Sequence, residues 1–226
     1  MTFSLLAHDP KTGIYGGAAA TGSLCVGGWV LRGDAESGLT ASQGTSPSTL
    51  WGTGALTLMR EGKTAVEAVH AVTSADPGRD HRQLAALEPQ GGTAAFTGSQ
   101  SVDYAGEAAS DGIVATGNML SNTDVLPAMI AAFTQTAGEM PDRLLAALRA
   151  AKTSGGDFRG LKSAALLVVS RHAPPLTLRI DLHPDDPIGA LEHLHSQAMS
   201  EPYHSWTKMV PTLDNPTRDG TGEAVA

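Results

Sequence analysis

The chain of 226 residues has little cysteine, few aromatic side chains and few positive charges. Its single cysteine, Cys25, excludes an intrachain disulfide and every motif built on paired cysteines, and favours a reducing compartment. Aromatic residues make up 4% of the chain, which leaves few platforms for stacking bases. With 15 Lys and Arg against 23 Asp and Glu, the formal net charge of −8 would repel a phosphate backbone. We therefore expect no nucleic-acid partner.

Long hydrophobic runs are also absent. No stretch approaches the ~18 apolar residues of a membrane span, and residues 1–9 lack the basic segment and apolar run of a signal peptide. These absences predict a cytoplasmic protein without a membrane partner. Hydrophobic residues nevertheless make up 41% of the chain and charged residues 17%, enough to form a sizeable core. We expect one domain over residues 1–200 and a partly disordered C-terminal extension over residues 201–226.

Strand signals occur in three groups along the chain. Residues 2–7, 13–21 and 37–43 have strand-like patterns, and we expect them to form a first sheet. Four short runs at hairpin-like spacing predict a second antiparallel sheet: residues 83–87, 93–97, 101–104 and 113–117. The continuous apolar run at residues 164–169 predicts a buried central strand, with residues 176–182 as its partner.

Helical periodicity separates these strand groups. It predicts a helix over residues 50–61 and a second helix that begins after a capping residue, Thr64. Three more helices are predicted over residues 123–133, 140–151 and 188–197. The order is therefore strands, two helices, strands, two helices, strands and one helix. This order predicts an α+β fold, a four-layer αββα sandwich of two antiparallel sheets flanked by helices.

Six short motifs follow one another along the chain: MTFS at residues 1–4, DPGRDHRQL at 76–84, AFTG at 95–98, GNML at 117–120, GGDFRG at 155–160 and SAAL at 163–166. In this combination the chain resembles the family called domain of unknown function 1028, over residues 2–197. That family is similar to the N-terminal nucleophile (Ntn) hydrolases, which have the αββα sandwich and cleave amide bonds. The resemblance implies a nucleophile at the first residue of the mature chain.

In this chain the implied nucleophile is Thr2, after removal of Met1. Methionine aminopeptidases act before small side chains, and threonine qualifies. A threonine hydroxyl needs a base, and a chain-terminal threonine carries one in its α-amino group. The amine has an ordinary pKa of about 7.7–8.0, so roughly a tenth of it is neutral at pH 7. The alternative is that Met-Thr is an ordinary chain start without a catalytic role.

The resemblance also implies residues around the nucleophile. Asn118 would donate its side-chain amide to a developing oxyanion, and Asp157 would fix or polarise the terminal amine and hydroxyl, with Ser163 beside it at the substrate. The alternatives are a turn residue for Asn118 and an exposed loop position for Asp157. Proteasome subunits carry a lysine in the third-strand region, where this chain has only Arg32. Arginine does not act as a proton acceptor, so Arg32 cannot replace the activating lysine, which this chain lacks in that region.

A second group of candidates follows the Pro77-Gly78 turn. Arg79, His81 and Arg82 concentrate cationic donors that would grip a substrate carboxylate. Gln43 is expected to line the same cleft, together with Ser46. The alternative is a loop anchored by ion pairs between these cations and the carboxylates of Asp76, Asp80 or Glu88.

Three further sequence patterns give only weak support for a functional site. Cys25 has apolar neighbours and fits a small buried side chain better than a thiol nucleophile. His193 and His195 point to nearly opposite sides of a helix, which favours a solvated helix over a metal site that would include His183. The S-x-x-K match at Ser205 lacks its companion motifs, so we treat it as chance. We expect no metal and no organic cofactor.

The sequence thus predicts an Ntn-type amidohydrolase that cleaves a small amide, lactam or N-acyl compound. Its partners would be the small-molecule substrate and further copies of the chain in a homo-oligomer. Because the activating lysine is missing, the alternative is a non-catalytic Ntn-like protein that binds a ligand or serves in an assembly. A metal hydrolase that uses the late histidines is a third possibility.

Overall fold

Alternation of side chains along the first strand, β1 (Thr2–Asp9), explains the centre of the fold. Phe3 and Leu5 point to one side of the strand and Leu6 to the other, and all three are fully buried. A strand that is buried on both faces needs a layer of structure on each side. In the computed structural model, which describes residues 2–155 and 160–220, those layers are a second sheet and a group of helices.

The described strands form two antiparallel sheets. The larger sheet has the order β10-β9-β2-β1-β8-β7 and the smaller sheet the order β3-β4-β5-β6. Besides β1, the larger sheet contains β2 (Ile14–Thr21), β7 (Gly106–Ser110), β8 (Ile113–Asn118), β9 (Ser163–Val169) and β10 (Leu176–Ile180). The smaller sheet contains β3 (Leu31–Asp34), β4 (Gly38–Gly44), β5 (Arg82–Leu87) and β6 (Thr93–Thr97).

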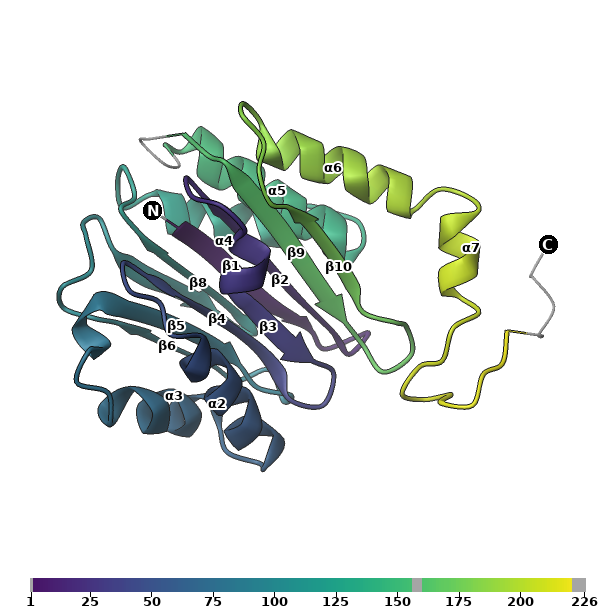
Figure 1. Cartoon of the computed structure of the whole chain (residues 1–226), viewed down its shortest axis with the longest axis horizontal. Coiled ribbons are helices and arrows are strands. Elements are labelled where there is room, and N and C mark those ends of the chain that lie inside the picture. Colours follow the sequence, from purple (N-terminus) through teal and green to yellow (C-terminus); the bar gives the residue numbers. More distant parts are fainter. Residues whose placement is uncertain (1, 156–159, 221–226) are drawn as a thin grey trace.

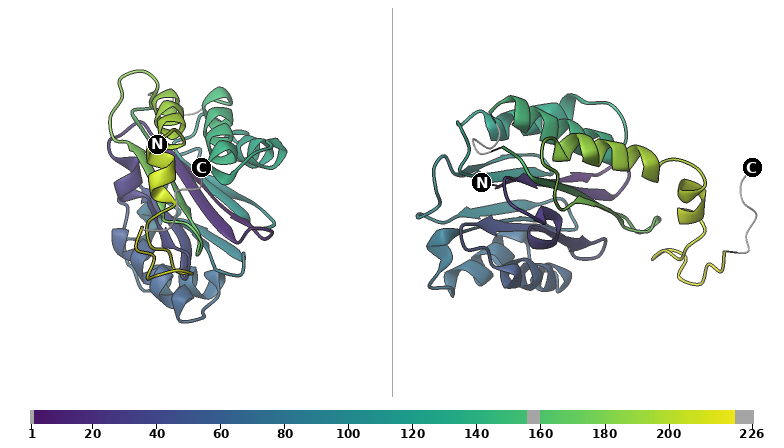
Figure 2. Two further views of the ribbon diagram at one scale, coloured as in Figure 1. Left: turned by 90° about the vertical axis from the view of Figure 1, so that its right-hand side faces the viewer. Right: turned by 45° about the horizontal axis from the view of Figure 1, so that its top comes forward.

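Helices cover the outer faces of both sheets (Figures 1 and 2). The larger sheet packs against α4 (Val125–Gln135), α5 (Met140–Thr153) and α6 (Pro187–Ala198). The smaller sheet packs against α2 (Thr49–Arg60) and α3 (Ala65–Ser74). The remaining described helices are short: α1 (Val26–Trp29), the 3₁₀ turn η1 (Arg79–His81) and α7 (Tyr203–Thr207). The predicted mixed α+β class with two antiparallel sheets and helices is confirmed.

Local chemistry sets the helix boundaries that were predicted. Thr64 and Glu67 form a capping box at the start of α3, in which the Thr64 hydroxyl accepts from the Glu67 main-chain N–H at 3.2 Å and the Glu67 carboxylate accepts from the Thr64 N–H at 2.9 Å. Pro141 occupies the first turn of α5, where its missing N–H costs no intrahelical hydrogen bond.

The predicted grouping of the strands into sheets was wrong for two strands, β4 and β8. Residues 37–43 were expected in the first sheet, but β4 pairs with β3 and β5 in the smaller sheet. Residues 113–117 were expected in the second sheet, but β8 pairs with β1 and β7 in the larger one. Residues 101–104 are not a strand, and the strand of this region is β7. Hairpin spacing favours pairing of consecutive strands, whereas the connection from β6 to β7 passes from one sheet to the other.

The segment after α6 leads away from the sandwich (Figures 1 and 2). It contains the helix α7, which sequence periodicity did not indicate, and a turn in which Thr212 is buried. Asp214 forms an ion pair with Arg171 at 3.1 Å, which ties this segment to the turn between β9 and β10. None of the described helices has both the length and the hydropathy needed to cross a membrane.

Candidate functional site

A row of polar side chains crosses the larger sheet at the start of β1. Strand register places Thr2 opposite Thr21 of β2 on one side and opposite Asn118 of β8 on the other, and it places Thr21 opposite Ser163 of β9. Thr2 is in phase with Leu6, which packs between the two sheets, so the row faces the smaller sheet. Four strands from distant parts of the sequence therefore contribute one neighbouring polar side chain each.

A second polar row lies on the facing side of the smaller sheet. Gln83 of β5 is opposite Gln43 of β4 and opposite Thr97 of β6. Gln43 and Gln83 are almost completely inaccessible to solvent. Ser4 and Thr116 continue the polar region one step further, and beyond them the layer between the sheets is lined by apolar side chains. The sandwich therefore has a polar end at Thr2, and buried polar groups there must find partners within the protein.

Gln83 joins the two rows through both ends of its amide. Its Oε1 accepts from Asn118 Nδ2 at 2.8 Å and from Gln43 Nε2 at 3.2 Å. Its Nε2 donates to the main-chain oxygen of Gly117 at 2.8 Å and to Thr97 Oγ1 at 3.1 Å. All the hydrogen-bonding capacity of this buried side chain is therefore used.

Thr2 is held from both sheets. Its Oγ1 lies 3.1 Å from Thr21 Oγ1, and its main-chain oxygen accepts from Gln43 Nε2 at 3.4 Å. Ser4, two residues along β1, donates to Gln43 Oε1 at 2.9 Å and so fixes the direction of the Gln43 amide. The orientation of Thr2 is therefore set by neighbours on two sheets.

A pocket of about 390 Å³ opens beside Thr2. Its floor is polar and its wall is apolar, with the half-exposed side chains of Leu24 and Trp29 on that wall. The lining residues are Thr2, Thr21, Ser23, Leu24, Val26, Trp29, Val30, Gln43, Gly44, Thr45, Ser46 and Pro47. The pocket thus lies between the start of β1, the segment that contains α1, and the end of β4.

Glycines bring the α1 segment close to the larger sheet. A Cβ added at Gly27 would lie 2.7 Å from Ala165 Cβ and 2.8 Å from Arg179 Cγ, which is closer than any real side chain approaches. Ser163 fixes the preceding loop, because its Oγ donates to the Ser23 oxygen at 2.9 Å and accepts from the Val26 N–H at 3.2 Å. This packing presents the apolar wall to the pocket.

Of the residues predicted to bind substrate, to act in catalysis or to line the cleft, Thr2, Gln43 and Ser46 line this pocket. Asn118 and Ser163 are in the same polar row but are buried beneath the pocket surface, where each has a partner within the protein. Asp157 lies outside the described residues. Sequence analysis missed Thr21 and Gln83, although polar residues in otherwise apolar strands are a signal that could have found them.

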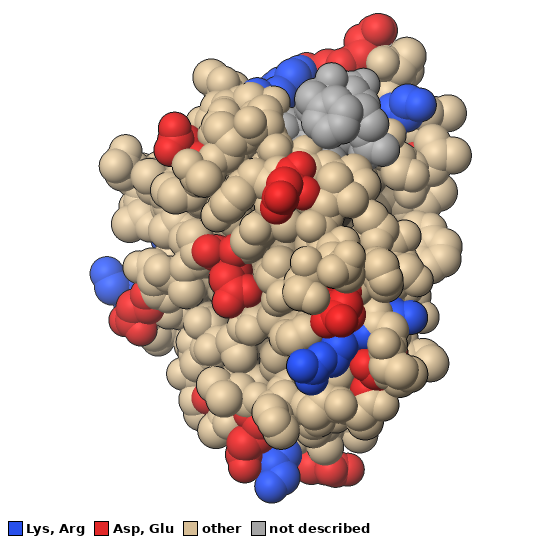
Figure 3. Space-filling model, turned by 90° about the vertical axis from the view of Figure 1, so that its left-hand side faces the viewer, with Lys and Arg blue, Asp and Glu red and all other residues tan. Residues whose placement is uncertain are grey.

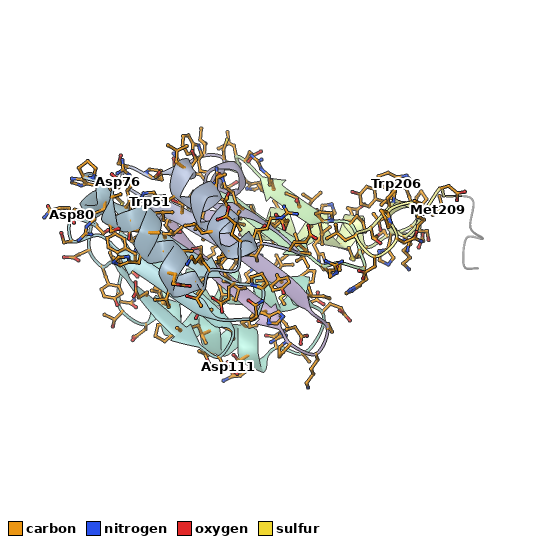
Figure 4. The ribbon with its side chains drawn as sticks, turned by 90° about the horizontal axis from the view of Figure 1, so that it is seen from below. Trp51, Asp76, Asp80, Asp111, Trp206 and Met209 are labelled. Carbon is orange, nitrogen blue, oxygen red and sulfur yellow. The ribbon has the colours of Figure 1, made fainter. Side chains whose placement is uncertain are left out.

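The predicted cationic group lies on η1 and the start of β5. Arg82 Nη1 forms an ion pair with Asp76 at 2.7 Å, and its Nε donates to the main-chain oxygen of Ser46 at 2.8 Å. The guanidinium carbon of Arg79 is 5.7 Å from the centre of the Phe96 ring, and the His81 side chain is exposed. Figure 4 shows Asp76 and Asp80 near Trp51, at one end of the molecule. None of the three cations is among the described lining residues.

Arg32 faces away from Thr2. Its neighbour Leu31 packs between the sheets, so Arg32 points to the opposite face of β3, where a Cβ added at Gly52 of α2 would touch it. The guanidinium donates to the main-chain oxygens of Trp29 at 2.7 Å and of Gly28 at 3.1 Å, and burial lowers its pKa. Arg32 therefore supports the α1 segment and does not take the place of the missing lysine at Thr2.

The remaining candidates lie elsewhere. His183 Nδ1 accepts from the main-chain N–H groups of Asp185 and Asp186, at 3.2 and 2.9 Å. Over residues 2–155 and 160–220, no group of three or more His, Cys, Asp or Glu is arranged to hold a metal ion. Cys25 is half-buried at the start of α1 and is not among the described residues that line the pocket.

These features define an α+β protein with a polar-floored pocket at one end of two stacked sheets. The chain belongs to the family of unknown function DUF1028, whose model matches residues 2–191. It is similar to the crystal structure of protein SPO2555 from Silicibacter pomeroyi, also of DUF1028, with 53% sequence identity and a TM-score of 0.93, covering 96% of this chain and 94% of that one. None of the curated proteins is matched.

A more distant solved structure is eukaryotic HslV from Trypanosoma brucei. It has 13% sequence identity and a TM-score of 0.44, and the match covers 74% of this chain and 99% of that one. A likeness at this level carries no argument about chemistry.

Proposed function

We propose that the protein is an Ntn-type amidohydrolase, that the two sheets with their flanking helices are an αββα sandwich of that kind, and that Thr2 is the nucleophile after Met1 is removed. The substrate would be a small amide, lactam or N-acyl compound. The observation that carries the proposal is the position of Thr2: it is the first residue of a strand, faces the layer between the sheets, and lines a pocket. Assembly into a homo-oligomer and a cytoplasmic location stay predictions.

In the proposed mechanism the hydroxyl of Thr2 attacks the substrate carbonyl while the α-amine of the same residue accepts the proton. The amine returns the proton to the leaving nitrogen, and water then releases the acyl group from Thr2. Asn118 would act beneath this centre. One of its two amide hydrogens goes to Gln83, and the other is the donor that the predicted oxyanion role would use.

Intact-mass measurement and substitution of Thr2 test the proposal together. The purified chain is expected to lack Met1. Thr2→Ala is expected to reduce turnover by at least about 10³-fold, whereas Thr2→Ser keeps part of it, because serine retains a hydroxyl. Thr177→Ala is the matched control, since it removes a threonine from an exposed strand position on β10. An active chain that retains Met1, or equal turnover by Thr2→Ala and the wild type, would refute the proposal.

One observation favours a second candidate function, a non-catalytic protein that binds a ligand in the same pocket or serves in an assembly. No lysine, arginine or histidine is among the described residues that line the pocket, and Arg32 faces the other side of its sheet. Covalent modification of Thr2 through its hydroxyl separates the two candidates. An amide analogue with an electrophilic carbonyl is expected to form a covalent adduct with a hydrolase and none with a binding protein, as measured by intact mass.

A further inference from the structure

The described wall and floor of the pocket carry no ionisable side chain. They contain hydroxyl groups, one primary amide and apolar groups. Arg82 reaches the pocket only through the main-chain oxygen of Ser46, and Asp76 neutralises its charge. A carboxylate that leaves water needs an ion pair or several donors in return, because burial of an unpaired charge is costly. This pocket offers it no described cationic side chain.

Part of the apolar wall is exposed to solvent. Trp29 is 52% exposed and Leu24 is 50% exposed, and both large hydrophobic side chains line the same pocket. Val26 and Val30 lie behind them and are buried. An apolar ligand group that covers Trp29 and Leu24 would therefore remove from water an area that the fold itself leaves exposed.

The end of the molecule at which β1 begins carries its charged side chains outside the described pocket lining. Figure 3 shows scattered acidic and basic side chains on this face, separated by large uncharged areas. The formal charge of −8 adds a long-range field that disfavours anions. Both observations agree with the composition of the described lining.

The proposed catalytic base gives a second reason to expect a neutral substrate. The α-amine of a terminal Thr2 must be neutral in order to accept a proton, and a carboxylate held beside it would favour the charged ammonium form. A carboxylate on the substrate would thus lower the fraction of the amine that is neutral and able to accept the proton. A neutral substrate leaves the amine free to act.

We infer that the substrate is an electrically neutral amide that carries an apolar group, aromatic or branched aliphatic, which packs on Trp29 and Leu24 while the amide reaches Thr2. This inference rests on the proposed function. It replaces the expectation that Arg79, His81 and Arg82 grip a substrate carboxylate, because Arg82 is engaged by Asp76 and none of the three lines the pocket.

Three matched probes test the inference. N-phenylacetylglycinamide is neutral and apolar, N-phenylacetylglycine differs from it by a carboxylate, and N-acetylglycinamide lacks the ring. Their affinities are measured by titration calorimetry on Thr2→Ala, which binds without turning over, and their hydrolysis is measured on the wild type. The neutral aromatic probe is expected to bind at least about tenfold more tightly than either of the others.

Two substitutions locate the binding. Trp29→Ala and Leu24→Ala, each made in the Thr2→Ala chain, are expected to weaken binding of the aromatic probe by about tenfold. Trp206→Ala is the matched control, because Trp206 is 53% exposed and lies on the C-terminal segment far from Trp51 and the pocket end (Figure 4). Since both wall residues are half exposed, we expect both variants to fold, and unchanged melting temperatures check this.

Each outcome has a definite meaning. Equal or tighter binding of the carboxylate probe, loss of affinity in Trp206→Ala but not in Trp29→Ala, or no binding of any probe overturns the inference. Selective binding without hydrolysis by the wild type supports the ligand chemistry and overturns the proposed hydrolase. Hydrolysis of the probes without preference among them supports the proposed hydrolase and overturns the inferred ligand chemistry.

Discussion

Replacement of Gln83 by leucine should reveal how much the buried polar end contributes to stability. Leucine is one bond shorter than glutamine but similar in volume, so it removes the amide without opening a large cavity. Asn118 Nδ2 then loses its described acceptor, and Gln43 Nε2 keeps only the 3.4 Å contact with the Thr2 oxygen. Thr97 is less affected, because its hydroxyl also reaches Glu107 Oε2 at 3.1 Å. Two buried amide donors are therefore left with poor partners or none.

The expected size follows from the cost of unsatisfied groups. A buried donor without a partner costs about 1–3 kcal/mol, so the two donors together should lower the free energy of unfolding by about 4 kcal/mol. In a chain of this length each kcal/mol lowers the melting temperature by roughly 3 °C, which gives a decrease of about 12 °C. Differential scanning calorimetry of wild type and Gln83→Leu measures this difference.

The control is Gln197→Leu, which makes the same chemical change at an exposed position of α6. Leucine and glutamine have similar helix propensities, so a shift below about 2 °C is expected there. If Gln83→Leu unfolds within about 2 °C of the wild type, the amide network is not a source of stability, and the account of the polar end given above is incorrect.

Two further predictions concern the backbone and pH. Gly38→Ala should lower the free energy of unfolding by more than about 2 kcal/mol, because φ is +83° and an added Cβ would collide with the Leu87 oxygen. Gly62→Ala, at φ +90° with open space around it, should lower it only by the backbone strain of about 1 kcal/mol. Urea titration of the two variants compares these free energies. The pKa of Asp186 is lowered from 3.8 to about 2, since burial raises it but hydrogen bonds from Lys152, Gly189 and Arg149 outweigh burial. This carboxylate therefore stabilises the fold above pH ~4 and loses that contribution as the pH falls toward ~2, so urea midpoints of Asp186→Asn should depend less on pH over that interval.

Helices and strand positions were predictable because their signals are local. The capping box of Thr64 and Glu67, or Pro141 in the first turn of α5, involves residues within a few positions of one another. The strand-like pattern of residues 2–7 likewise indicated the strand β1. The membership of each strand in a sheet was not local, and the prediction that residues 37–43 join the first sheet failed for that reason.

The candidate site was predictable in part. Thr2 and Gln43 were chosen from the sequence by family resemblance, and both line the pocket. Gln83 was not chosen, because a single glutamine at the start of an apolar strand looks like a strand end until register places it between Gln43 and Thr97. Leu24 and Trp29 escaped notice because α1 is too short for periodicity to reveal.

The sequence by itself determined the family, the α+β class, the order of the longer helices, and the absence of paired cysteines and of long apolar runs. Tertiary structure alone decided that β4 faces β1 across the sandwich, and that Thr2 and Gln43 meet beside a pocket with an uncharged described lining. The physical reason is the range of the forces. Propensity, capping and alternation act over a few residues, whereas register and sheet-on-sheet packing join side chains that are tens of residues apart in the chain.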